Sequence, residues 1–306
     1  MRIVSLLPSA TEIAYALGLR EQLVAVSHEC DYPPDVRELP QITSSILGHD
    51  LDPKQIDDAV VQAVGEGRAL YQIDGDLLRE LEPDLILTQG VCDVCAVSQG
   101  TVDETLVFLP ELAADVKTLS LSGATFEGIL RDMRLLAEAT RREARAAELS
   151  ADLRKRWHIL ESTPPQNRPR VLMLEWPEPP FYGGHWVPEM VAVAGGIDVL
   201  GHVGMDSKRT TWAEIAATDP DIIVSIACGY DLAKNTEFAQ NLYTHPEAKH
   251  LRAVQNERVW ACDANSYFSR PAPRIIEGAE MLRGTFTGEA LEGGSRMLEI
   301  LEPVTS

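Results

Sequence analysis

Two of the five cysteines in the chain, Cys92 and Cys95, form a Cys-X2-Cys pair. At this spacing two thiolates can bind one metal ion or form a redox-active disulfide. Cys30 stands two residues after His28 in the segment SHECDYPP. The alternative is that these thiols are small buried side chains that line the wall of a pocket. The candidate ligands for zinc, iron or an iron–sulfur cluster are His28, Cys30, Cys92 and Cys95.

A second candidate site is the aromatic segment at residues 175–186. It follows the apolar run of residues 171–174 and contains three prolines and two glycines. Large flat side chains on a segment that proline stiffens are costly to leave in water, and they suit a large flat ligand. The alternative is that the segment packs on its own domain. Its aromatic and polar members are Glu175, Trp176, Phe181, Tyr182, His185 and Trp186.

Short apolar segments alternate with helical patterns along the chain and must position these residues. The alternation predicts an α/β fold with parallel sheets, whose ligands bind beyond the carboxyl ends of the strands. Each candidate residue above follows such a strand. The expected strands span residues 3–7, 23–26, 85–87, 116–119, 171–174, 222–226 and 258–261.

The chain has the length of two domains. Residues 163–170, TPPQNRPR, have the composition of a linker and follow a long helical pattern. The segments LRELEPDLIL and WAEIAATDPDIIV share the order of helix, Pro-Asp and apolar strand, which indicates two lobes of similar topology. We predict an N-terminal lobe at residues 1–140, a linking helix at 141–162 and a C-terminal lobe at 170–306.

Composition and hydropathy exclude several classes of partner. The 47 acidic side chains outnumber the 27 basic ones, and the net charge of -20 repels phosphate backbones, so nucleic acid is not expected to bind. A membrane-spanning helix needs about 18 uninterrupted apolar residues, and the sequence has no such run, so no membrane span is expected. The apolar run at residues 3–7 is too short for the core of a signal peptide, which predicts a cytoplasmic protein with reduced cysteines.

Six segments between about Ile3 and Arg283 carry a resemblance to a known family. They are IVSLLPSATEIAYALG, VAVSHECDYPP, LLRELEPDLIL, MLEWPEPPFYGGHWVPEMVAVAGG, TWAEIAATDPDIIV and NSYFSRPAPRII. With these segments the chain resembles the cobalamin-binding proteins of the helical-backbone (class III) periplasmic substrate-binding protein family. The resemblance implies two Rossmann-like lobes bridged by one long α-helix, with a ligand held without catalysis in the cleft between them.

The resemblance also implies which residues line the ligand site. Carried over by position they are Ser9, Ala10, Asp31, Tyr32, Trp176, Phe181, Gly183, Trp186, Tyr267, Phe268, Ser269 and Arg270. His185 joins them as a neighbour in the same segment. The family docks on an ABC transporter through one acidic residue on each lobe, and these positions fall on Asp76 and near Glu214. The second position is offset by one, so docking is left open, as is the oligomeric state.

We therefore expect non-catalytic binding of cobalamin or a related corrinoid, with the thiols and His28 able to approach cobalt, since imidazole and thiolate both bind transition metals. A protein or enzyme with a thiol-ligated metal is the alternative. Haem or a siderophore complex is a third ligand class. Three features depart from the family: no visible export signal, the cysteines at Cys30, Cys92 and Cys95, and an insertion at about residues 44–71.

Overall fold

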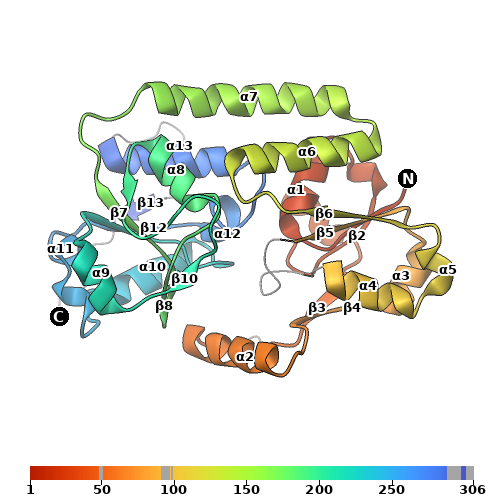
Figure 1. Ribbon diagram of the computed structural model, residues 1–306, viewed down its shortest axis with the longest axis horizontal. Helices are drawn as coiled ribbons and strands as arrows, with labels where there is room; N and C mark the ends of the chain where they lie inside the picture. Colours follow the sequence, from red (N-terminus) through yellow and green to blue (C-terminus); the bar gives the residue numbers. More distant parts are fainter. Residues whose placement is uncertain (48–50, 91–96, 98, 288–297, 301–306) are drawn as a thin grey trace. The chain divides into compact units, whose positions relative to one another are not determined.

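The computed structural model describes residues 1–47, 51–90, 97, 99–287 and 298–300. The chain forms two compact units. The first unit comprises residues 1–123 and 127–150, and the second comprises residues 124–126 and 151–306. The long helix α7 (Glu143–Ser162) contributes its beginning to the first unit and its remainder to the second. Both units are α/β, as predicted (Figure 1).

The first unit is built on a four-stranded parallel sheet in the order β2-β1-β5-β6. The strands are β1 (Ile3–Ser5), β2 (Leu23–Val26), β5 (Leu85–Gln89) and β6 (Lys117–Leu121). One face carries Val4 and Ile86 and packs on α3 (Gly75–Leu81), α4 (Gln99–Val107) and α5 (Pro110–Ala113). On the other side lie α1 (Pro8–Ala16) and α6 (Phe126–Thr140) (Figure 1). The 3-10 turns are η1 (Arg20–Gln22) and η2 (Pro34–Glu38).

An insert in the first unit extends beyond this sheet. The antiparallel ribbon of β3 (Thr43–Ser45) and β4 (Tyr71–Ile73) leads to α2 (Pro53–Gly65), which stands clear of the four-stranded sheet (Figure 1). A capping box begins α2, because the Asp52 carboxylate accepts the Gln55 backbone N–H at 2.8 Å. The ribbon and helix coincide with the insertion expected from the sequence.

The second unit has a larger sheet in the order β10-β8-β7-β11-β12-β13, with β9 on β7. The strands are β7 (Arg170–Pro177), β8 (Pro180–Tyr182), β9 (Ile197–Asp198), β10 (Lys208–Arg209), β11 (Ile222–Ser225), β12 (Val259–Cys262) and β13 (Leu298–Ile300). β7, β11 and β12 are parallel. Residues 171–174 are at most 1% exposed, which confirms the predicted buried strand.

Helices cover both faces of this second sheet. Leu172, Leu174 and Ile223 pack with α9 (Trp212–Thr218), α10 (Leu232–Asn241) and α11 (Arg252–Gln255). The opposite face is covered by α8 (Val187–Ala194) and α13 (Ile275–Thr287), which contact each other (Figure 1). The short elements η3 (Ala248–His250) and α12 (Ala264–Tyr267) complete the unit.

The strand expected at residues 171–174 does not end at Leu174. β7 continues to Pro177 and turns back as β8, with Trp176 opposite Phe181 in an antiparallel pair. The prolines do not interrupt this pairing because Pro177 ends β7 and Pro180 begins β8, and proline is tolerated at strand ends. The aromatic side chains are therefore held by a sheet hairpin.

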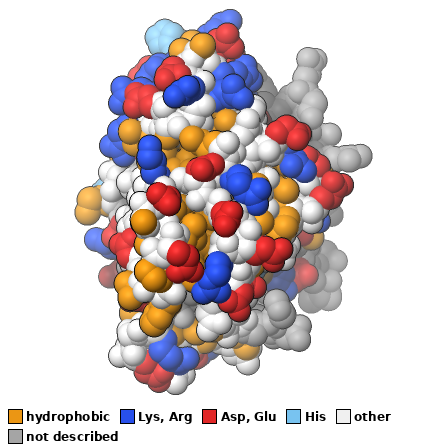
Figure 2. All heavy atoms as spheres, turned by 90° about the vertical axis from the view of Figure 1, so that its right-hand side faces the viewer, with side chains coloured by type: hydrophobic (Ala, Val, Ile, Leu, Met, Phe, Trp, Pro, Cys, Tyr) orange, Lys and Arg blue, Asp and Glu red, His pale blue; other side chains and the backbone are white. Residues whose placement is uncertain are grey.

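Within the described residues, no helix is long and apolar enough to cross a membrane. On the face shown in Figure 2, acidic and basic side chains alternate with small apolar areas. This face therefore carries no broad field of one sign, despite the net charge of -20.

Candidate functional site

Aromatic rings gather at the carboxyl ends of β7 and β11 in the second unit. The ring of Trp176 lies 5.8 Å from that of Tyr230 at a tilt of 38°, and Tyr230 meets Phe238 edge-on at 5.2 Å. Phe181, across the hairpin from Trp176, has the Arg209 guanidinium 5.5 Å from its ring centre. Trp176, Phe181 and Tyr230 are only half-buried. Part of each side chain therefore remains open to a ligand.

Asn235 fixes the turn that presents Tyr230. Its side chain is fully buried, and its Oδ1 accepts the Ala227 N–H at 2.6 Å and the Ser225 hydroxyl at 3.1 Å. Its amide nitrogen donates to the backbone carbonyls of Tyr230 and Asp231 at 3.0 and 3.1 Å. One side chain thus forms hydrogen bonds with backbone groups at both ends of the turn between β11 and α10. The position of Tyr230 therefore depends on Asn235.

Hydrogen bonds hold the segment after β8 against residues 204–207. The Ser207 hydroxyl donates to Glu175 Oε1 at 2.7 Å and accepts the Gly184 N–H at 3.1 Å. The His185 N–H donates to the Met205 carbonyl. His185 has a φ of +54°, and burial lowers the pKa of its imidazole below the usual range. Glu175 and His185 therefore belong to a fixed scaffold beside the aromatic rings.

We expect Gly184→Ala to disturb this scaffold and to lower the free energy of unfolding by about 2 kcal/mol. A Cβ atom at Gly184 would lie 2.5 Å from both the Asp206 carbonyl carbon and the Met205 carbonyl oxygen, which are backbone atoms. Urea unfolding measures the effect. Gly65→Ala is the matched control, because a Cβ there meets nothing within 4 Å. Equal stability of the two variants would contradict the prediction.

Several residues implied by the resemblance lie in the core of the second unit instead of at an open surface. Trp186 is 6% exposed, and its Nε1–H donates to the backbone carbonyl of Phe268 at 2.8 Å. Phe268 is 2% exposed. Gly183 is buried, and Arg270 is 5% exposed and donates to Asn265 Oδ1 at 2.8 Å. Each of these four residues therefore leaves little or no surface exposed.

Tyr267 and His185 keep partial exposure in the second unit. Tyr267 is half-buried, with the Arg274 guanidinium 5.4 Å from its ring centre. The His185 side chain is 15% exposed and stacks on Trp186 with ring centres 5.6 Å apart. Both side chains retain some surface for a ligand, but neither belongs to the ring cluster around Trp176.

In the first unit, the predicted residues lie at or near the carboxyl ends of β1 and β2. Ser9 is 4% exposed in the first turn of α1, whereas Asp31 is half-buried and Tyr32 is 41% exposed. Cys30 is 3% exposed, and its Sγ lies 3.2 Å from Thr11 Oγ1. His28 Nδ1 lies 2.7 Å from Thr43 Oγ1. His28 and Cys30 thus contact different side chains although they are close in sequence.

The described residues do not support the alternative of a thiol-ligated zinc or iron site. Nowhere in that part of the chain do three or more His, Cys, Asp or Glu side chains come together as metal ligands. Cys92 and Cys95 lie outside the described residues. In the second unit Cys262 is fully buried, and this burial raises the pKa of its thiol, so it behaves as a packed apolar side chain.

The two docking positions implied by the resemblance differ in their surroundings. The Asp76 side chain is 95% exposed in α3 and pairs with Arg79 at 2.7 Å. Glu214 belongs to the capping box of α9, and its Oε2 accepts the Thr210 hydroxyl at 2.9 Å and the Thr211 N–H at 3.0 Å. These hydrogen bonds, the Thr210 bond foremost, lower the pKa of Glu214.

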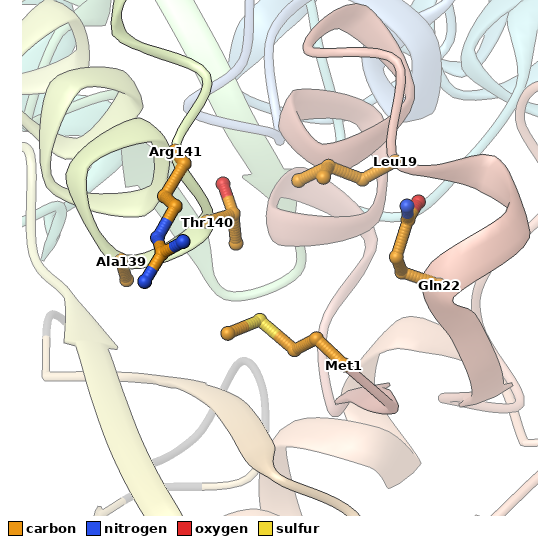
Figure 3. A pocket seen from close by; sticks show the side chains of 6 residues that line it. All are labelled: Met1, Leu19, Gln22, Ala139, Thr140 and Arg141. Atoms are coloured by element: carbon orange, nitrogen blue, oxygen red, sulfur yellow. The ribbon is translucent and has the colours of Figure 1, made fainter.

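One pocket of the first unit lies away from the strand ends that carry the candidate residues. It has a volume of about 290 Å³. Figure 3 shows Met1 at its edge, and Met1 precedes β1, so the pocket adjoins the amino ends of the strands. Ligands of parallel sheets bind at the opposite ends. The lining residues are Met1, Leu19, Gln22, Ala139, Thr140 and Arg141.

Comparison with known proteins identifies the family of this chain. Residues 3–266 match the family described as periplasmic binding protein. The chain belongs to the periplasmic binding protein family. The vitamin B12-binding protein of Vibrio cholerae is 25% identical over 284 residues, which cover 92% of this chain and 87% of that protein. The ABC transporter substrate-binding lipoprotein YvrC of Bacillus subtilis is 24% identical over 293 residues, 92% of this chain and 78% of that protein.

Solved structures of this family share the fold. The vitamin B12-binding protein BtuF of Vibrio cholerae has a TM-score of 0.66 and 23% identity, and the match covers 95% of this chain and 98% of that chain. The heme-binding protein RhuT of Roseiflexus sp. RS-1 has a TM-score of 0.69 and 21% identity, with 94% and 98% covered. This periplasmic binding protein is accordingly a two-lobed, non-catalytic binder of a small molecule.

The prediction of a cytoplasmic protein is wrong. The family is one of periplasmic binding proteins, and one relative is a lipoprotein of an ABC transporter, so these findings point to a location outside the cytoplasm. The prediction rested on the short apolar run at residues 3–7, which contains the buried strand β1. A strand inside the folded domain carries no information about targeting.

Sequence reasoning missed the residues that hold the aromatic cluster in place. Asn235 looks like an ordinary polar residue of a helix, and Ser207 stands 32 residues from Glu175. Thr43, the partner of His28, stands 15 residues away, in the inserted ribbon. The one available signal was Asn235 itself, because asparagine is unfavourable inside a helix unless its side chain has a partner.

Proposed function

We propose that this periplasmic binding protein binds a corrinoid of the cobalamin type at the carboxyl edge of the second unit's sheet. The observation that carries the proposal is the cluster of half-buried rings of Trp176, Phe181 and Tyr230. Flat aromatic faces suit the apolar rim of a corrin. The hairpin of β7 and β8 fixes Trp176 and Phe181, and Asn235 fixes the turn of Tyr230, so little entropy is lost on binding. Glu175 and Asn235 stabilise the segments next to these rings through hydrogen bonds.

The choice of a corrinoid over other flat ligands is supported by the curated relatives. The vitamin B12-binding protein of Vibrio cholerae aligns with 92% of this chain, and the protein of that name from Photorhabdus laumondii is 26% identical over 286 residues. Haem is the second candidate, because the aromatic faces suit it as well and RhuT shares the fold. The described residues give no support to a resident zinc or iron ion.

A transporter partner is also proposed from the family assignment. YvrC is named as the substrate-binding lipoprotein of an ABC transporter. Asp76, with its carboxylate almost fully exposed in the first unit, is the candidate contact for such a partner. It borders a groove of about 450 Å³ that also includes Arg79 and the 80% exposed Phe108.

Removing the Trp176 ring is expected to weaken corrinoid binding. We expect Trp176→Ala to raise the Kd for cyanocobalamin roughly thirtyfold, the equivalent of about 2 kcal/mol for a central aromatic contact. Calorimetric titration measures the change. Trp157→Ala is the matched control, because Trp157 lies on α7 and stacks on Phe126 at 4.1 Å, away from the hairpin. Equal losses in both variants would count against the proposed site.

A further inference from the structure

Arg141 stands at a position of the first unit where the backbone favours glycine. It directly follows the last residue of α6, and its φ is +58°. Around it, the Arg142 N–H donates to the Ala137 carbonyl at 2.8 Å, in a pattern that ends many helices with glycine at the left-handed position. Any other side chain costs free energy in this conformation. The backbone therefore does not explain why an arginine is present here.

The Arg141 side chain lines the pocket of about 290 Å³ described above. In Figure 3, Ala139 and Arg141 lie on one side of this pocket, and the side chains of Leu19 and Met1 extend toward them from the other. All of these residues belong to the first unit. The volume is near the lower end of the range found for small-molecule sites. The pocket thus combines one cation with an apolar wall.

The charge of Arg141 is not balanced inside the pocket. Arg141 is exposed, and within the described part of the chain its guanidinium makes no hydrogen bond or ion pair. Among the six described residues that line the pocket none is acidic, although the chain has 47 Asp and Glu residues. The Thr140 hydroxyl already donates its one hydrogen to the Leu136 carbonyl at 2.7 Å. Arg141 is therefore the charged donor that a ligand would meet, and a guanidinium binds a carboxylate through two parallel hydrogen bonds.

We propose that this pocket is a second ligand site, which binds a small monocarboxylate with a short apolar chain. The carboxylate pairs with Arg141, and the chain lies against Met1, Leu19 and Ala139. Burial of the chain adds affinity in proportion to its length. The pocket adjoins the amino ends of the strands of the first unit, whereas the proposed corrinoid site is built from residues of the second. The inference is therefore independent of the proposed function.

Methyl NMR of the full-length protein tests the proposal, with sodium hexanoate as the probe. Protein labelled with ¹³C-methyl methionine gives one signal for each of its seven methionines. We expect the Met1 signal, assigned through Met1→Leu, to shift and to saturate with a Kd in the millimolar range or tighter. The Met205 signal is the internal control, because that side chain is 52% exposed in the second unit. Absence of a saturable Met1 shift, or an equal shift of Met205, would overturn the proposal.

Two further probes separate the contributions of the charge and of the chain. Acetate retains the carboxylate but lacks the apolar chain, and it is expected to bind roughly tenfold more weakly than hexanoate, or weaker still. Hexylamine retains the chain but carries a positive charge, and it is expected to leave the Met1 signal in place. Equal affinities of hexanoate and hexylamine would overturn the role of the carboxylate. Equal affinities of hexanoate and acetate would overturn the role of the apolar wall.

Two variants of Arg141 test the pairing with the carboxylate. Arg141→Gln and Arg141→Gly are each expected to weaken hexanoate binding roughly tenfold or more. Arg141→Gly should not lower the Tm, because glycine is favoured at this φ, so its loss of binding cannot be assigned to unfolding. Arg134→Gln is the matched control, since Arg134 is 65% exposed on the same helix and pairs with Glu138. Unchanged hexanoate affinity in both Arg141 variants would overturn the proposal.

Discussion

Replacing Asn235 with alanine is expected to lower the free energy of unfolding by about 3 kcal/mol, because the change leaves the buried Ala227 N–H and the buried Ser225 hydroxyl without the acceptor they share. The carbonyls of Tyr230 and Asp231 lose the side-chain amide as a donor but keep the backbone N–H groups of residues 265 and 235. The turn that presents Tyr230 then loosens, so corrinoid affinity should fall in the folded variant as well. Urea unfolding and calorimetric titration measure the two effects.

Asn241→Ala is the matched control for this prediction. Asn241 is the last residue of the same helix, α10, and it is exposed. Its removal leaves the buried network intact and is expected to change stability by less than about 0.5 kcal/mol. A stable Asn235→Ala variant with unchanged corrinoid affinity would show that the turn is held by its own backbone.

The buried carboxyl of Asp198 is expected to make stability fall as pH rises. Asp198 ends β9, and its Oδ1 accepts the backbone N–H groups of Leu200 and Gly201 at 3.1 and 2.7 Å. Its Oδ2 is buried with no hydrogen-bond partner among the described residues. Burial outweighs the two hydrogen bonds and raises the pKa of Asp198 from 3.8 to about 6.

Because this pKa is higher in the folded protein than in the unfolded chain, the folded state binds the proton more tightly. The free energy of unfolding therefore decreases as pH rises from about 4 to about 6, and the loss persists at higher pH. Asp198→Asn removes the charge and retains the acceptor for both N–H groups. Between pH 4 and 7.5, the stability of this variant should rise relative to wild type by roughly 3 kcal/mol.

Urea unfolding at several pH values measures this relative change. The control is Asp115→Asn, because Asp115 is exposed and its replacement should leave the pH dependence of stability unchanged. A difference between Asp198→Asn and wild type that stays constant across the pH range would contradict the assignment of a raised pKa to Asp198.

Apolar patterning was sufficient to predict the parallel sheets. Residues 171–174 are apolar without interruption because helices cover both faces of β7. The hairpin of β7 and β8 was missed because a segment rich in proline has the composition of a loop. Proline is compatible with pairing only at strand ends, and the pairing of Trp176 with Phe181 appears only once the positions of Pro177 and Pro180 in the strands are known.

The sequence showed which residues are aromatic, but it did not show which of them remain exposed to a ligand. Trp176 and Phe181 keep partial exposure, but Trp186 and Phe268, which have the same chemical character, lie in the core. Their contact joins residues 82 positions apart in the sequence. Likewise, Tyr230 meets Trp176 because β11 pairs with β7, which no local pattern reveals. Tertiary pairing therefore decides which aromatic side chains remain open to a ligand.

The central claim is that this periplasmic binding protein recognises a corrinoid in preference to other flat ligands. Calorimetric titration of the purified protein with cyanocobalamin, and separately with ferric haem, tests it most directly. We predict one cyanocobalamin bound per chain in the micromolar range or tighter, and weaker binding of haem. Tighter binding of haem, or no heat of binding with cyanocobalamin, would contradict the claim.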